Sequence, residues 1–200
     1  MNPFESLEIE EILSQPVRLV RERLRTKKGE ELVYIYRPGP VAAAFVLPVT
    51  EAQTAYFIRQ YRHPTGKYLL EIPAGKVDAG ETPLEAAARE LMEEVGARAK
   101  EFVPLPPFHP QPSFTAVVFH PFVAFGAERV AGPNREAGEE METVELSLLE
   151  AYRLLHQGEI LDASTALTLF YARPILLRRL GLDEKALDPY SEGGFEGEGA

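Results

Sequence analysis

The sequence predicts an α/β fold preceded by an antiparallel β-hairpin, on three observations. Strand-like apolar runs fill much of the first 72 residues, a capped amphipathic helix follows at 82–96, and two further helical segments lie near the end. With 200 residues, 45% of them hydrophobic, the chain can bury one sizeable core.

The first forty residues have the pattern of a β-hairpin. Residues 17–24 and 31–36 are strand-like runs, and the turn signal TKKG at 26–29 separates them. The sequence PGP at 38–40 then ends the pattern. We therefore expect residues 1–40 to form an N-terminal β-hairpin subdomain.

The main domain is expected to cover residues 41–182. Residues 41–48 and 55–61 are apolar strands on either side of a turn, and the strand at 68–72 leads directly into a loop and a helix. Later elements follow in the order proline-rich stretch (104–112), strand (114–125), acidic loop (126–142), strand (143–146) and helices (148–156 and 163–180).

Composition excludes several classes of protein. The net charge of −10 argues against nonspecific binding to nucleic acid, and without cysteine there is neither a disulfide framework nor thiolate chemistry. The start of the chain is acidic, unlike a signal peptide, and the longest apolar run is too short to span a bilayer. We expect a soluble, cytoplasmic protein with a mobile, acidic, glycine-rich tail at 183–200.

Residues 82–96 carry start and stop signals for a helix. Thr82 is a good N-cap, Pro83 suits the first turn, and Glu85 completes a capping box, while Gly96 supplies the stop. An apolar stripe recurs at helical spacing, so this helix should pack on a core; the stripe is Leu84, Ala87, Ala88, Leu91 and Val95.

Glu90, Glu93 and Glu94 crowd three carboxylates into the last two turns of that helix. Each neighbouring pair of like charges costs roughly 0.2–0.5 kcal/mol, and anions near a helix C-terminus oppose the macrodipole. A solvated acidic face would be the ordinary interpretation. A divalent cation would instead turn the repulsion into coordination, because Mg²⁺ and Mn²⁺ prefer carboxylate oxygens.

The spacing of this segment resembles the Nudix box, G-x5-E-x7-R-E-U-x-E-E-x-G-U, where U is a bulky aliphatic residue. Leu91 occupies the first aliphatic position and Ala97, smaller than usual, the last. The seven fixed letters match Gly75, Glu81, Arg89, Glu90, Glu93, Glu94 and Gly96. The resemblance to the Nudix hydrolase family implies an α/β/α sandwich with a mixed sheet.

Further segments resemble one branch of that family, the ADP-ribose pyrophosphatases. They are RQYR at 59–62, EIPAG at 71–75, GEI at 158–160, and Asp162, Ala163 and Thr165. The resemblance implies a homodimer in which the N-terminal strands cross to the partner. It also implies Mg²⁺-dependent hydrolysis of a nucleotide pyrophosphate bond, with ADP-ribose giving AMP and ribose 5-phosphate.

Two other hypotheses stay open. The same chemistry could act on FAD, a diadenosine polyphosphate or a sugar nucleotide such as GDP-mannose. Alternatively, the chain could be a catalytically silent regulator that binds ADP-ribose.

The expected metal ligands are Glu90, Glu93 and Glu94, and the resemblance adds the backbone carbonyl of Ala74. Arg89 lies one turn before Glu93 and would hold a carboxylate in orientation. Glu81 has two equally good roles, metal binding and hydrogen bonding within the loop.

Substrate binding is expected from Arg59, Arg62, Glu71 and the loop at Pro112 and Ser113. An arginine at a strand end suits a phosphate, whereas Glu71 fits a metal, a ribose or a salt bridge equally well. Relatives commonly read S-P-G-x-T-x-E after the box, where this chain has QPSFTAV at 111–117. Val117 thus stands where those relatives carry an acid, so this chain lacks that carboxylate.

A general base would come from the acidic loop, where Glu139 and Glu140 stand in a position resembling the mobile catalytic loop of the branch. The alternatives are that these acids are only solvated and that water attacks without a protein base.

Overall fold

The computed structural model describes residues 2–39, 41–134, 140–184 and 187. The chain forms two compact units. The first contains Met1–Ala42 and Phe108–Val118, and the second contains Ala43–Pro107 and Phe119–Ala200. Sequence alone does not separate Phe108–Val118 from the main domain.

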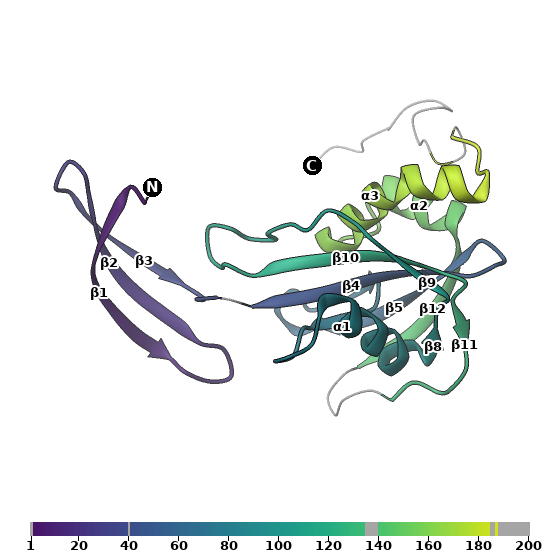
Figure 1. Ribbon diagram of the computed structural model, residues 1–200, viewed down its shortest axis with the longest axis horizontal. Coiled ribbons are helices and arrows are strands. Elements are labelled where there is room, and N and C mark those ends of the chain that lie inside the picture. The colour runs from purple at the N-terminus through teal and green to yellow at the C-terminus, as the bar shows by residue number, and fades with distance from the viewer. Residues whose placement is uncertain (1, 40, 135–139, 185–186, 188–200) are drawn as a thin grey trace. The chain divides into compact units, whose positions relative to one another are not determined.

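The first unit is a three-stranded antiparallel sheet in the order β1 (Phe4–Leu13), β2 (Leu19–Thr26), β3 (Glu31–Tyr36) (Figure 1). The predicted hairpin of β2 and β3 is confirmed, and its turn uses Gly29 at a φ of 84°. Strand β1 was not predicted. Its alternate acids form cross-strand pairs with the arginines of β2, so a run that looks like a solvated segment is an edge strand.

The predicted strand at 114–125 begins later than expected, because β10 is Val118–Phe125. The amides of Phe114 and Thr115 donate to the carbonyl of Gln111, which folds this stretch into a turn. The Phe114 carbonyl then accepts from the Arg37 amide at 2.9 Å. The first four residues of the expected strand therefore belong to the first unit and not to the central sheet.

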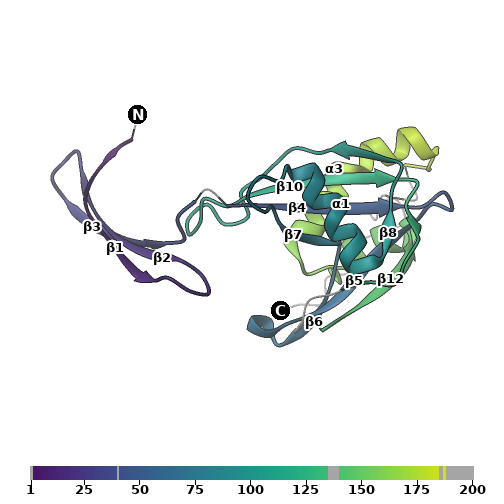
Figure 2. The same cartoon turned by 60° about the horizontal axis from the view of Figure 1, so that its bottom comes forward.

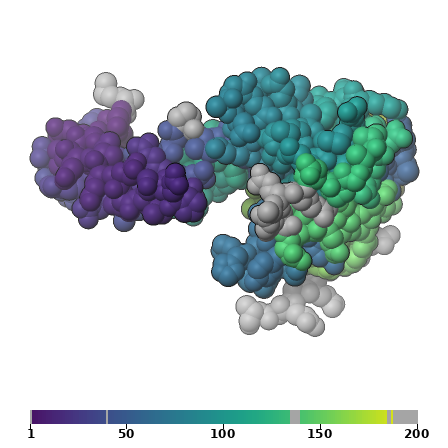
Figure 3. Space-filling view, turned by 90° about the horizontal axis from the view of Figure 1, so that it is seen from below, coloured from purple at the N-terminus to yellow at the C-terminus, as the bar shows by residue number. Residues whose placement is uncertain are grey.

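The second unit is built on a mixed seven-stranded sheet in the order β12-β5-β4-β10-β9, with β6 beside β5 and β7 beside β4. Its strands are β4 (Ala42–Val49), β5 (Thr54–Arg62), β6 (Lys67–Glu71), β7 (Ala74–Lys76), β9 (Glu101–Pro104), β10 and β12 (Met141–Ser147). A short 3₁₀ turn, η1 (His63–Thr65), joins β5 to β6, and two short strands, β8 (Ala97–Arg98) and β11 (Glu128–Arg129), pair separately. The β5–β6 end projects as a lobe from the rest of this unit (Figures 2 and 3).

Helix α1 (Pro83–Glu90) continues into a single π-helical turn, η2 (Leu91–Val95). The predicted capping box is confirmed: Thr82 accepts from the Glu85 amide, and the Glu85 carboxylate accepts from the Thr82 amide. Gly96 ends the turn at a φ of 74°, as expected of a C-terminal glycine. The two late helices, α2 (Leu148–His156) and α3 (Ala163–Leu180), have the predicted bounds.

Helices cover both faces of the central sheet (Figure 1). On one face Leu47 and Phe57 pack against α2 and α3, and on the other Val46 and Ile58 pack against α1 and η2. Alternate residues of β4 and β5 thus pack into two separate cores, one on each face of the sheet. Because both faces are buried, these strands are continuous apolar runs in the sequence. This is the predicted α/β/α sandwich.

Two further expectations concern the acidic tail and membrane-spanning segments. Of the acidic tail at 183–200, only Asp183, Glu184 and Leu187 belong to the described residues, so its expected mobility lies outside them. Within the described part of the chain, no helix is both long and apolar enough to cross a membrane.

Candidate active site

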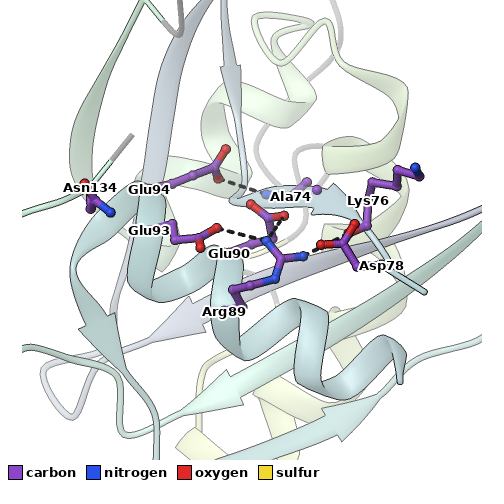
Figure 4. A pocket seen from close by; sticks show the side chains of 9 residues that line it. Ala74, Lys76, Asp78, Arg89, Glu90, Glu93, Glu94 and Asn134 are labelled. Carbon is purple, nitrogen blue, oxygen red and sulfur yellow. Dashed lines mark hydrogen bonds and ion pairs between the residues drawn. The ribbon is translucent and has the colours of Figure 1, made fainter. Parts of the chain in front are cut away.

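A pocket of about 310 Å³ opens between β7 and the end of the α1–η2 helix (Figure 4). Its lining residues are Ala74, Gly75, Lys76, Asp78, Arg89, Glu90, Glu93, Glu94 and Asn134. Strand and helix converge here because the loop between them returns the chain through the capping box at Thr82. The pocket brings together all four expected metal ligands.

Arg89 ties the acids of the box together. Its guanidinium donates to Glu81, Glu90 and Glu93 at 2.7 to 3.1 Å, and also to the Lys76 carbonyl at 2.9 Å. The hydrogen bonds to Glu81 come first among the causes that raise the pKa of Arg89. Arg89 therefore stays charged and can orient carboxylates, as its spacing in the sequence predicts.

Glu81 structures the loop before the helix. Its Oε2 accepts from the Asp78 amide at 3.1 Å, and both of its oxygens accept from Arg89. The bond to Arg89, and after it the Asp78 amide, lowers the pKa of Glu81. Of the two roles open in the sequence, these contacts favour hydrogen bonding within the loop.

The carboxylate of Glu90 lies directly over Gly75. A Cβ atom built on Gly75 would stand 1.8 Å from Oε1 of Glu90. The first glycine of the box is thus required by close approach and not by a turn.

Glu94 is the most buried acid of the pocket, with 4% of its surface exposed. Its Oε2 accepts from the Ala74 amide at 3.0 Å (Figure 4). Because η2 closes its hydrogen bonds over five residues where an α-helix closes them over four, Glu94 is turned relative to its α-helical position. The sequence pattern predicted these acids but not the π-turn.

Glu93 is more open, with 42% of its side chain exposed, and its backbone carbonyl accepts from the Asn134 amide at 2.7 Å. Asn134 and Asp78 are pocket residues that sequence reasoning missed. For Asp78, the signal was its place in the short loop between Gly75 and Glu81. Asn134 had no local signal, because it is brought in by a segment about forty residues further along the chain.

The donor set suits a hard divalent cation. Four carboxylates line the pocket beside two cationic side chains, Lys76 and Arg89, which leaves an excess of negative charge. In the arrangement described, Glu90 and Glu93 face Arg89 and Glu94 faces Ala74, and no group of three His, Cys, Asp or Glu side chains among the described residues is placed to hold a metal. Binding of a cation would therefore require the carboxylates to turn toward it, while Arg89 and the Ala74 amide keep them beside the pocket.

Glu71 and Arg62 form a bidentate pair beside the segment that leads into the pocket. Arg62 donates through Nε and Nη2 at 2.8 and 2.6 Å, and Glu71 is 5% exposed. The bond to Glu71 leads the causes that raise the pKa of Arg62. The salt bridge foreseen as one role of Glu71 is therefore present. Arg59 is more exposed than Arg62, and its Nη1 lies 3.3 Å from Oε1 of Glu142.

Pro112 and Ser113 lie in a second pocket, of about 340 Å³, inside the first unit. Tyr34, Tyr36 and Phe114 contribute aromatic rings to its wall. The Tyr36 hydroxyl donates to Glu22 at 2.8 Å, which raises the pKa of this tyrosine. The loop near Pro112 thus meets the two hairpin tyrosines within one unit.

Of the two acids expected to act as general base, the structure describes only Glu140. Glu140 is exposed, and its carbonyl accepts from the Tyr61 amide at 3.0 Å, so its backbone continues the pairing of β12 with β5. Glu139 lies outside the described residues.

A family model described as "NUDIX domain" matches residues 39–166, a span that contains the whole pocket. The chain belongs to the Nudix family. An ADP-ribose pyrophosphatase of Bacillus subtilis (strain 168) is 35% identical over 146 residues, which are 72% of this chain and 77% of that protein. A methanol dehydrogenase activator of Bacillus methanolicus is 34% identical over 140 residues, 68% of this chain and 73% of that one.

A solved structure described as an ADP compounds hydrolase has the same Nudix fold. It is 26% identical, with a TM-score of 0.79 over 88% of this chain and 95% of that one. These similarities confirm the resemblance to the ADP-ribose pyrophosphatase branch and make this Nudix protein a pyrophosphohydrolase. Nudix hydrolases generally use divalent metal ions, which agrees with the chemistry of the donor set.

Proposed function

We propose that this Nudix enzyme hydrolyses the pyrophosphate bond of ADP-ribose to AMP and ribose 5-phosphate, with Mg²⁺ or Mn²⁺ in the pocket beside α1. The observation that carries the proposal is the meeting of Glu90, Glu93, Glu94 and Ala74 around one pocket. The ADP-ribose pyrophosphatase of Bacillus subtilis supports the choice of substrate.

The proposed ligands are the carboxylates of Glu90, Glu93 and Glu94 and the carbonyl of Ala74. A bound divalent cation supplies positive charge against the bridging phosphates and makes an attacking water more acidic. Arg89 keeps Glu90 and Glu93 oriented, and the Ala74 amide holds Glu94. The protein's contribution is mainly positioning, as phosphoryl chemistry requires.

Substrate contacts are proposed for Arg59 and Arg62, as partners for phosphate oxygens, and for Pro112 and Ser113. Arg62 is held by Glu71, yet 45% of its side chain stays exposed. The aromatic rings beside Pro112 and Ser113 suit stacking on an adenine. Glu139 or Glu140 is the proposed general base, and attack without a protein base remains the alternative.

We also propose that the enzyme is a cytoplasmic homodimer. Val33 and Ile35, alternate residues of β3 and therefore on one face of the N-terminal sheet, are 58% and 50% exposed, and neighbouring exposed apolar side chains mark a surface for association. A second copy of the chain would cover such residues. Light scattering after size-exclusion chromatography tests this, and a monomer at micromolar concentration would contradict it.

The test of the activity compares substrates under Mg²⁺. ADP-ribose, FAD, NADH, GDP-mannose and diadenosine polyphosphates are incubated separately, products are separated by chromatography, and kcat/KM is obtained for each. We expect ADP-ribose to be preferred. A preference for another compound would keep the chemistry and reassign the substrate.

The pocket is tested by Glu90→Gln combined with Glu94→Gln. We expect AMP release to disappear, because the charge that holds the cation is lost. Glu85→Gln is the matched control, since this acid lies on the same helix in the capping box and outside the pocket. Unchanged turnover in the double variant would refute the proposed site, and tight ADP-ribose binding without turnover by the wild type would favour the regulator hypothesis.

A further inference from the structure

The chain changes its strand partner immediately before the pocket. Glu71, the last residue of β6, pairs with Ile58 of β5, whereas Ala74, the first residue of β7, pairs with Phe45 of β4. Ile72 lies between these two ladders and is 1% exposed. Its amide therefore needs a partner that neither strand ladder nor solvent supplies.

Thr165, in the first turn of α3, provides that partner. Its Oγ1 accepts from the Ile72 amide at 3.1 Å, and the residue is fully buried. The Thr165 amide in turn donates to the N-cap Asp162 at 2.7 Å. Capping fixes the backbone of Thr165, and burial fixes its β-branched side chain, so the acceptor stands at a defined place.

The bond to Ile72 is the first in a series that ends at the pocket. The carbonyl of Pro73 accepts from the Val46 amide at 2.9 Å, and the amide of Ala74 donates to Glu94 at 3.0 Å. Pro73 has a fixed φ, so a displacement of Ile72 passes to Ala74 with little local accommodation. Glu94 and the Ala74 carbonyl, both proposed metal ligands, thus depend on where Ile72 is held.

We propose that Thr165 is a positioning residue for the metal-binding side of the pocket. It touches neither substrate nor metal, and it acts through the Ile72 amide on Ala74 and Glu94. The inference rests on the proposed metal-dependent function, and it adds to the site a residue from the helix layer on the opposite face of the sheet.

Thr165→Val tests the proposal, because it keeps the shape of the side chain and removes the acceptor. Thr168→Val is the matched control: Thr168 is also fully buried on α3, but its hydroxyl donates to the Ser164 carbonyl within the helix. Residue-resolved amide exchange and Mn²⁺ binding by electron paramagnetic resonance are measured on both variants. We expect Thr165→Val alone to speed exchange at Ile72 and Ala74 and to weaken Mn²⁺ binding about tenfold.

Thr165→Ser, which restores the acceptor, should restore both the exchange protection and the Mn²⁺ affinity. Equal Mn²⁺ affinities in Thr165→Val and Thr168→Val, or unchanged exchange at Ala74, would overturn the inference. If Thr165→Val does not fold, Thr165→Ala removes the same acceptor and is judged by the same criteria. A wild type that binds Mn²⁺ but hydrolyses no nucleotide would defeat the proposed function, while the affinities and exchange rates would still decide the role of Thr165.

Discussion

The N-terminal sheet and the pocket beside α1 both pair arginine with glutamate, but the two networks differ in burial and in stoichiometry. In the sheet Arg21, Arg23 and Arg25 face acids of β1 and β3, and the paired side chains are 42% to 65% exposed. At the pocket Arg89 alone serves three acids, of which Glu81 and Glu90 are 15% and 12% exposed and Glu93 is 42% exposed.

Ion-pair distances do not distinguish the two networks: they span 2.6 to 3.4 Å in the sheet and 2.7 to 3.1 Å around Arg89. The difference lies in what surrounds the charges. Exposed pairs contribute little to stability, because water competes for each charge. Acids that outnumber their cations in a half-closed pocket keep a net charge, which is the condition for binding a cation. Burial and charge excess thus separate the network proposed to bind a cation from the surface network.

Among single substitutions, the largest effect should come from Gly75→Ala. The new Cβ would meet the Glu90 carboxylate, the far end of a flexible side chain, so the fold should tolerate the change while the carboxylate moves. We expect kcat/KM for ADP-ribose to fall on the order of 100-fold, as for a misplacement of about 1 Å, with little change in the thermal midpoint. Gly132→Ala, where a Cβ meets open space, is the control. Full activity in Gly75→Ala would mean that the position of Glu90 is not essential.

Arg89→Gln should come next. Removing the guanidinium leaves Glu81, Glu90 and Glu93 without their common partner and frees the two pocket acids to adopt other rotamers. We expect kcat/KM to fall roughly 10- to 100-fold, as for the loss of a group that orients metal ligands. Steady-state kinetics over a Mg²⁺ titration measures this. A loss that saturating Mg²⁺ fully reverses would limit the role of Arg89 to metal affinity.

A smaller effect is expected on the pKa of one acid from each network, Glu81 beside the pocket and Glu31 in the sheet. Arginine partners lower the pKa of both Glu81 and Glu31 below the ordinary 4.5. Each carboxylate therefore stabilises the fold above its ordinary pKa, and this contribution is lost as the pH falls through the lowered value. In about 1 M salt, where screening acts over about 3 Å, we expect the shift of Glu31 to shrink and that of Glu81 to persist. Carboxyl NMR titrations at two salt concentrations check this, and equal shrinkage would remove the distinction.

The smallest effect is expected from Arg23→Gln, the counterpart of Arg89→Gln in the sheet. Arg23 bridges Glu8 and Glu31 at 3.0 and 3.1 Å, but all three side chains are about half exposed. On a sheet face open to water, this substitution gives no measurable change in thermal midpoint or in kcat/KM. A clear loss of either would show that the sheet network is buried in the working protein, for example by a partner subunit.

Local signals in the sequence predicted most of the second unit. The capping box at Thr82 and Glu85, the stop at Gly96 and the bounds of α2 and α3 depend on residues close in the chain, and the structure confirms them. The π-turn escaped prediction because its residues keep the apolar spacing of an ordinary helix. Strand β1 was missed because its acids find arginines only once β2 lies beside it.

The candidate site was predictable where one segment supplies it. Glu90, Glu93, Glu94 and Arg89 share one helix, their spacing singled them out, and the structure brings them to one pocket. Asn134 reaches the pocket from a distant loop, and Thr165 acts across 93 residues of sequence, so no local pattern marks either contact. The pairing of Arg62 with Glu71 likewise depends on the register of β5 and β6.

The single π-turn at Leu91–Val95 has a consequence for how this helix tolerates changes in length. A π-turn is in effect an α-helix with one residue inserted, held here because Leu91 and Val95 are both fully buried while Glu94 faces Ala74. Deleting one residue within the turn would let the helix relax to regular α geometry, with a net gain in backbone regularity. The segments before and after the turn would keep their phase, but the residues inside the tightened turn would be turned from their present directions, carrying Glu94 away from the Ala74 amide. A shorter and more regular helix would thus be a better helix with a displaced pocket acid, and engineering of this enzyme for stability should leave its length at this turn unchanged.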